Sequence, residues 1–140
     1  MSYWLVKSEP DAWSWDEQVK AGPKGTAWTG VRNHTAKANL KAMKAGDLAF
    51  FYHSGVGKEI VGVAQVTREQ FPDPTDKTKM FVAVDLKAVA PMPKPVTLAA
   101  IKAEPKLAEM ALVKQSRLSV QPVTAQEWKL VCAMGGWKGA

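Results

Sequence analysis

Several tryptophans in this sequence stand where an indole ring can bind a ligand. The chain of 140 residues contains six of them. Trp4 and Trp128 fit core positions on a strand and a helix, whereas Trp13, Trp15 and Trp28 fall in loops or at a helix start. A tryptophan in a loop can stack its flat ring on a nucleobase, but it can equally close the end of a hydrophobic core. The residues alone leave both roles open for these three side chains.

Arg32 is the charged residue with the most informative position. A helix is predicted to follow it, with Ala36 on the face that points into the protein. If that helix extends back to Arg32, the arginine lies close to the same inward face. A half-buried arginine needs hydrogen-bond acceptors. The acceptors are either protein carboxylates, with Glu9 and Asp47 as candidates, or a phosphate or base edge at the mouth of a pocket.

Signals for catalysis and metal binding are weak. His34, His53 and Cys132 are isolated in the sequence, and metal sites need clustered ligands. Cys132 falls on the apolar face of a predicted helix, where a buried structural thiol is expected. The segment 55–58 lacks the length and the hydroxyl residue of a phosphate-binding loop. The sequence therefore predicts no metal and no cofactor.

The hydrophobic pattern predicts the elements that would position these groups. Strands are predicted at 3–7, 48–53, 59–66, 81–90 and 118–121. Helices are predicted after the capping boxes at 14–17 and 124–127, over 33–43, and briefly after Thr97 and Pro105. Pro91, Pro93 and Pro95 are expected to end the strand before them, and 71–75 to form a rigid loop.

This alternation of strands and helices predicts the fold class. Strands interleaved with short helices give an α+β domain. The strand-rich middle, with its hairpin-like joins, predicts a small, mostly antiparallel β-barrel with flanking short helices. One domain over residues 1–140 is expected, because 46% apolar and 23% charged residues are ordinary values for a folded chain of this length.

Charge and cysteine content bound the partners and the compartment. The net charge of +6 favours polyanions, and most of the 19 cations are lysines, which suit phosphate attraction better than bidentate base contacts. One cysteine indicates a reducing interior, and the N-terminus lacks the pattern of a signal peptide. No apolar run approaches the roughly 18–20 residues of a membrane helix. We therefore expect a cytoplasmic protein without a membrane partner, and a monomer because no long heptad or exposed apolar strand is present.

Five segments of the sequence resemble signatures of the EVE domain family. In chain order they lie at 3–10, 28–33, 46–54, 71–75 and 116–123. EVE domains belong to the PUA-like superfamily, together with YTH and SRA-type readers of modified bases. The resemblance implies a PUA-like barrel with a pocket for one flipped-out or single-stranded modified base in DNA or RNA, with modified cytosine as the leading candidate.

A weaker similarity to YTH domains implies roles for single residues. The pairs Lys7-Ser8 and Trp28-Thr29, and the triplet at 62–64, resemble the Lys-Ser strand, the cage tryptophan and the Gly-X-Ala strand of that family. Trp28 is then the stacking wall, with Phe71 or Trp15 as candidates for a second wall. The nucleobase-binding residues expected from these resemblances are Lys7, Ser8, Glu9, Trp15, Trp28, Thr29, Val31, Arg32, Asn33, Tyr52, His53, Ser54, Arg117 and Ser119.

The favoured function is recognition of a modified base without catalysis. Lysines and Arg32 would hold phosphates, while Ser8, Glu9 and the Thr29 backbone would read the base edge. A carboxylate only accepts hydrogen bonds, so Glu9 prefers an amino or ring N–H group. The alternative is a small ASCH-like hydrolase of modified nucleosides, with Lys7, Glu9 and His53 as its acid and base groups. A structural interaction module is the third hypothesis.

Overall fold

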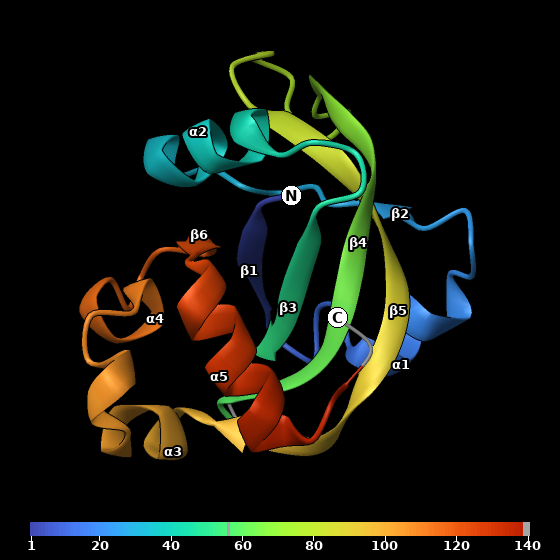
Figure 1. The fold of residues 1–140 in the computed structure, drawn as a ribbon. Coiled ribbons are helices and arrows are strands. Elements are labelled where there is room, and N and C mark those ends of the chain that lie inside the picture. Colours follow the sequence, from blue (N-terminus) through green and yellow to red (C-terminus); the bar gives the residue numbers. More distant parts are fainter. Residues whose placement is uncertain (56, 139–140) are drawn as a thin grey trace.

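Six strands form one mixed sheet in the computed structural model, which describes residues 1–55 and 57–138 (Figure 1). The strands are β1 (Tyr3–Ser8), β2 (Thr26–Ala27), β3 (Leu48–His53), β4 (Glu59–Pro72), β5 (Val82–Thr97) and β6 (Val120–Val123). Their order is β2-β5-β4-β3-β1-β6, with β1 and β3 parallel and the other neighbours antiparallel. The predicted α+β class is confirmed. Within the described residues no pairing joins β2 to β6, so the expected barrel is not closed.

Four short helices begin where the sequence predicted them, but the helix expected after Pro105 is only a 3-10 turn, and the short helix that begins at Ala111 was not predicted. The helices are α1 (Trp15–Lys20), α2 (His34–Ala42), α3 (Leu98–Ala103), α4 (Ala111–Lys114) and α5 (Ala125–Gly135), with a 3-10 turn at Pro105–Leu107. Both predicted capping boxes are present, and the Asn33 and Thr97 side chains cap α2 and α3. Among the described helices, none has the length and apolar character needed to cross a bilayer.

The long hairpin of β4 and β5 corrects two sequence predictions. Pro72 lies inside β4, paired with Val82, so the expected loop at 71–75 is shorter. β5 continues through Pro91, Pro93 and Pro95 instead of ending at the first of them. In this stretch β5 pairs only with β4 among the described residues, so it is an edge, where a proline without an N–H group is tolerated. The last strand lies at 120–123 rather than 118–121.

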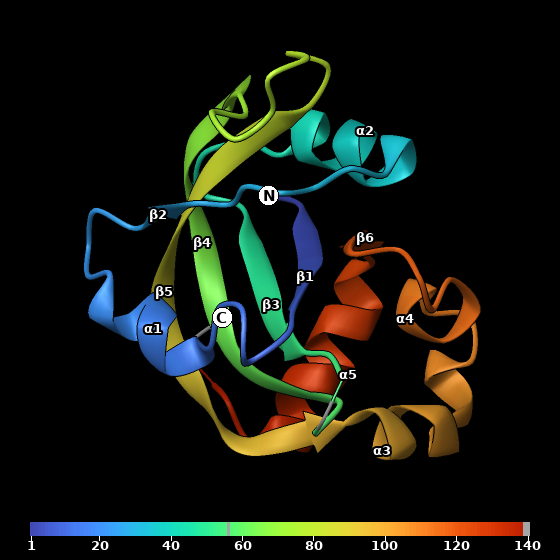
Figure 2. The same ribbon diagram turned by 180° about the vertical axis from the view of Figure 1, so that it is seen from behind.

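Both faces of the sheet carry a hydrophobic core. Successive residues of a strand point to opposite faces, so Phe51 joins one core and Phe50 the other. The first core includes residues of α1 and α2, and the second includes residues of α3, α4 and α5. Figures 1 and 2 show α5 on one side of the sheet and α1 on the other. Trp4 and Trp128 are buried, as predicted, and Trp15 and Trp28 are buried as well.

Candidate functional site

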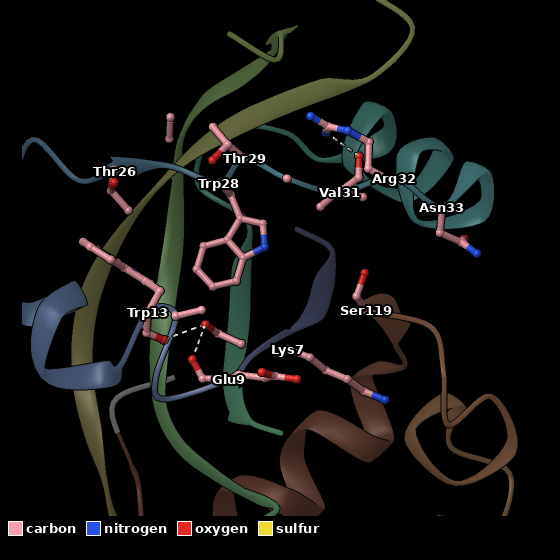
Figure 3. A pocket seen from close by; sticks show the side chains of 14 residues that line it. Lys7, Glu9, Trp13, Thr26, Trp28, Thr29, Val31, Arg32, Asn33 and Ser119 are labelled. Atoms are coloured by element: carbon pink, nitrogen blue, oxygen red, sulfur yellow. Dashed lines mark hydrogen bonds between the residues drawn. The ribbon is translucent and has the colours of Figure 1, made fainter. Parts of the chain in front are cut away.

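A hollow of about 580 Å³ lies against the end of β1, β2 and the loop that leads into α2 (Figure 3). This volume is in the range of small-ligand sites, about 300–1,000 Å³. The lining residues are Lys7, Ser8, Glu9, Ala12, Trp13, Thr26, Ala27, Trp28, Thr29, Gly30, Val31, Arg32, Asn33 and Ser119. In Figure 3, Lys7 and Glu9 lie along one side of the hollow and Arg32 and Asn33 along the opposite side.

The structure brings most of the predicted base-binding residues to this one hollow. Those that line it are Lys7, Ser8, Glu9, Trp28, Thr29, Val31, Arg32, Asn33 and Ser119. The predicted residues that do not line it are Trp15, Tyr52, His53, Ser54 and Arg117. Trp15 lines a separate hollow, Tyr52, His53 and Ser54 lie at or just after the end of β3, and Arg117 lines a neighbouring hollow.

Trp28 forms a rigid part of the wall. Its side chain packs edge-to-face on Phe51, with ring centroids 5.6 Å apart at 85°, and its backbone N–H donates to the Val84 carbonyl over 2.7 Å. The residue is 7% exposed and still borders the hollow. Within the described chain its indole Nε1 makes no hydrogen bond, which leaves a donor for a ligand. Trp28 thus has one surface on the core and another on the hollow.

Trp13 is a second indole at the hollow, and it was absent from the predicted binding residues. Its Nε1 donates to Oε1 of Gln18 over 2.8 Å, and the fully buried Gln18 amide donates to the Leu86 carbonyl over 2.8 Å. The Ser8 hydroxyl donates to the Trp13 carbonyl over 2.5 Å. These bonds fix the loop between β1 and α1. The signal that could have selected Trp13 is its place just after the predicted reader segment at 7–9.

The two candidates for a second aromatic wall lie elsewhere. The Trp15 ring packs against Phe51, with centroids 5.3 Å apart, in a space that Gly62 leaves open: a Cβ built at Gly62 would lie 2.4 Å from this ring. Phe71 lies under the Arg68 guanidinium, with 4.0 Å from Cζ to the ring centroid. Neither aromatic lines the hollow.

Residues at the end of β3 hold the hollow from behind because β3 runs parallel to β1. Ser8 pairs with His53 in register, and the Ser54 N–H donates to the Ser8 carbonyl over 3.0 Å. His53 Nε2 accepts the Trp15 backbone N–H over 3.0 Å, so this ring nitrogen carries no proton. Burial lowers the pKa of His53, against the attraction of nearby carboxylates, and burial raises the pKa of Tyr52.

Lys7 places a cation at the edge of the hollow. Its Nζ donates to the Ser116 carbonyl over 2.6 Å and lies 5.8 Å from the centroid of the Tyr52 ring. Burial lowers the pKa of this half-buried ammonium group. Glu9, two residues further on, is exposed at the rim. The site therefore presents charges of both signs.

Arg32 pairs with a carboxylate that the sequence did not indicate. Its Nη1 lies 3.0 Å from Oδ2 of Asp73, and its Nη2 donates to the Thr75 hydroxyl over 3.1 Å. The predicted partners, Glu9 and Asp47, are wrong. Asp47 instead accepts from Trp4 Nε1 and from the backbone N–H groups of Ser2 and Lys44. Because the helix begins after the Asn33 cap, Arg32 lies outside it, and its side chain is 41% exposed.

Asp73 organises the rim of the hollow. Besides Arg32, its side chain accepts the Gly30 N–H over 2.8 Å and the N–H and hydroxyl of Thr75 over 2.7 and 2.6 Å. Burial raises the pKa of this carboxyl, but the hydrogen bonds from Thr75, Gly30 and Arg32 outweigh it and hold the pKa below its usual range. The β4–β5 hairpin thus ties down the loop that carries Trp28 and Thr29.

Comparison with known proteins finds relatives that match nearly the whole chain. The family model described as "EVE domain" matches residues 2–134. A Rhodopseudomonas palustris protein of known structure is 67% identical, with a TM-score of 0.92 over 97% of this chain and 94% of that one. Human thymocyte nuclear protein 1 is 34% identical across 95% of this chain and 73% of its own length.

Two further solved structures were obtained with nucleic acid. One is the crystal structure of human THYN1 protein in complex with 5-methylcytosine-containing DNA. That chain is 32% identical in sequence to this one, and the two superpose with a TM-score of 0.88 over 99% of both chains. A YTH domain from Zygosaccharomyces rouxii, in complex with N6-methyladenosine RNA, has a TM-score of 0.59 at 17% identity. The second likeness shows a shared fold alone.

Proposed function

The chain belongs to the EVE domain family, and on that premise we propose that it reads a modified nucleobase, with modified cytosine first, in DNA or RNA. The observation that carries the proposal is the preformed hollow beside β1, bordered by the indoles of Trp13 and Trp28 and by the polar groups of Ser8 and Glu9. The human relative's structure with 5-methylcytosine-containing DNA supports the same ligand class.

The energetics of binding favour a reader that takes one base out of its stack. Unstacking the base costs a few kcal/mol. Stacking on an indole recovers about 1–3 kcal/mol, and Trp28 is already fixed against Phe51, so little ordering is needed. A methyl group buried against the wall adds about 0.8 kcal/mol, which is roughly a fourfold preference. The methyl group thus contributes selectivity, and stacking supplies more of the affinity.

Polar groups at the hollow complement the edge of a cytosine. The Ser8 hydroxyl donates its proton to the Trp13 carbonyl, so toward a ligand it is an acceptor. The exposed Glu9 carboxylate is also an acceptor, and Trp28 Nε1 is a donor. An exocyclic amino group can donate to the two acceptors. The indole N–H lies in the plane of its ring, so with a base stacked on that ring it is left for a sugar or phosphate oxygen beside the base.

The same contacts favour binding over catalysis, so we propose a module that is not an enzyme. In the hydrolase alternative, Lys7, Glu9 and His53 act together. Lys7 Nζ, however, is bonded to the Ser116 carbonyl, and His53 Nε2 is bonded to the Trp15 N–H behind the hollow. Release of product from acylated or alkylated nucleosides would favour the hydrolase instead.

Oligomeric state and compartment remain part of the proposal. The large exposed apolar side chains of the described residues, Met1, Val19, Met80 and Val89, are scattered along the chain, which supports a monomer. The single cysteine supports a reducing compartment, and the cytoplasm remains the predicted one. Light scattering of the purified protein checks the first point.

Calorimetry with short oligonucleotides tests the base-reading proposal. We expect about fourfold tighter binding of a strand with one 5-methylcytosine than of its unmethylated copy. Trp13→Ala should weaken binding of the methylated strand by about 1–3 kcal/mol, because an indole wall is lost. Trp137→Ala removes a half-buried tryptophan outside the hollow and should leave the affinity unchanged. Equal affinity for both strands would contradict the proposal.

Glu9→Gln provides a test that depends on the sign of the effect. If Glu9 only lies near the strand, removing its charge reduces repulsion of phosphates and strengthens binding of every oligonucleotide. If Glu9 accepts from the base, a charge-assisted bond becomes a neutral one, and binding of the cytosine strand weakens by about 1 kcal/mol. Tighter binding by Glu9→Gln would rule out the second role.

A further inference from the structure

A second hollow adjoins the first and has a different chemistry. Its volume is about 340 Å³, and its lining residues are Asn33, Thr35, Gln115, Ser116, Arg117 and Leu118. Asn33 borders both hollows. Arg117 is the one charged residue in this lining, it is exposed, and among the described residues it forms no ion pair. The second hollow thus combines a free guanidinium group with uncharged polar side chains.

The segment 115–119 forms the partition between the two hollows. Ser119 faces the first hollow, whereas Ser116 and Arg117 line the second. Lys7 reaches across from β1, and its Nζ donates to the Ser116 carbonyl, which ties the partition to the strand that carries Ser8. Two cations therefore lie at this segment, Lys7 on the side of the first hollow and Arg117 on the side of the second.

The donors of the second hollow are suited to a phosphate. Asn33 Oδ1 accepts the Ala36 N–H over 2.9 Å, so the amide NH₂ group of Asn33 is left to donate. Thr35 and Ser116 add hydroxyl groups, and the guanidinium of Arg117 can hold two phosphate oxygens at once. No carboxylate lines this hollow, in contrast to Glu9 at the first. An uncharged ring would leave the guanidinium group unpaired.

We infer that the second hollow binds the phosphodiester group next to the base held in the first hollow. This inference rests on the proposed function and makes it more specific. The ligand is a nucleotide within a strand, because a free nucleoside has no phosphate to place at Arg117. DNA and RNA share this group, so separate DNA and RNA oligonucleotides distinguish the two sources.

The test compares Arg117 variants on two ligands: a single-stranded oligonucleotide with one 5-methylcytosine, and free 5-methylcytidine or its deoxy form. For a single strand, losing one phosphate contact makes the slope of log affinity against log salt concentration shallower by about 0.7. Over a tenfold change in salt, the affinity of the variant therefore changes about fivefold less than that of the wild-type protein. Arg117→Ala should show this loss on the oligonucleotide and leave nucleoside binding, followed by NMR titration, unchanged. Arg117→Lys should restore most of the slope, because lysine still attracts phosphate as a point charge.

Lys102→Ala is the matched control, since it removes one exposed positive charge from α3, which lies at the far end of the sheet from α2 in Figure 1. Its salt slope should equal that of the wild-type protein. The inference is overturned if Arg117→Ala keeps the wild-type slope, if it weakens nucleoside binding equally, or if Lys102→Ala loses as much. If the wild-type protein binds neither ligand, the proposed function itself fails, which is a separate result.

Discussion

Replacing Asp73 by asparagine tests whether the β4–β5 hairpin holds the rim of the base-binding hollow. Oδ2 of Asp73 accepts the Gly30 N–H over 2.8 Å and an Arg32 N–H over 3.0 Å, while Oδ1 accepts from Thr75. Asparagine can keep the Thr75 bonds through its oxygen. Its NH₂ group then faces the Gly30 N–H, so two donors oppose each other and the rim loses its anchor.

The expected loss follows from these contacts. Losing an ordinary hydrogen bond costs about 0.5–1.5 kcal/mol, and because Gly30 is exposed its freed N–H can bond to water rather than remain unpaired. Arg32 adds little, because its side chain is 41% exposed and can turn to water. A total near 1 kcal/mol is small against the roughly 5–15 kcal/mol of a typical domain, so the variant should still fold. Ordering one rim residue again upon binding costs about 1–2 kcal/mol, which weakens base binding about five- to thirtyfold.

Urea denaturation and calorimetry measure the two effects, and Asp76→Asn is the matched control. Asp76 lies in the same hairpin and accepts from Thr78, Met80 and Phe81, which hold its pKa at about 2. These bonds stay within 76–81, so Asp76→Asn should lower stability without weakening base binding. Unchanged stability and affinity in Asp73→Asn would refute the reasoning, and so would an equal loss of affinity in both variants.

Three further outcomes follow from buried groups. Burial holds the pKa of His53 in the folded protein below its usual 6.5, so as the pH falls below 6.5 the unfolded chain binds more protons than the folded one. The free energy of unfolding should therefore fall with the pH. Urea titrations from pH 7.5 to 5 should show a smaller fall in His53→Gln than in the wild-type protein. Gly62→Ala should destabilise the protein by about 1–3 kcal/mol in the same assay, because its Cβ would overlap the Trp15 ring. Cys132, whose pKa burial raises to about 11, should react slowly with a thiol reagent at pH 8 in the native state and quickly in denaturant.

Local sequence patterns predicted the helix starts and the strand faces well. The capping boxes at Ser14 and Thr124 involve residues within one helical turn, so the sequence contains all of their atoms. The alternation along β5 likewise predicted that Val84 and Leu86 face the same core. The extension of β5 through its prolines was missed, because whether a strand is an edge depends on which strands lie beside it.

The membership of the site was predictable only in part. The resemblance named segments, and within them the structure separates residues that line the hollow, such as Ser8, from those behind it, such as His53. The parallel pairing of β1 with β3 makes this separation, and the two strands are far apart in the sequence. Trp13 reaches the hollow because α1 folds back so that Gln18 can bond both its indole and β5.

The sequence by itself determined the α+β class, the starts of the four helices with side-chain caps, and the supply of indoles, cations and polar groups. Tertiary structure decided that Arg32 pairs with Asp73, that the sheet stays unclosed between β2 and β6, and that Arg117 faces a hollow of its own. The physical reason is range. Helix caps and strand alternation depend on neighbours a few residues away. Asp73 is separated from Arg32 in the sequence by α2, β3 and β4, so the two side chains become partners only once the chain has folded.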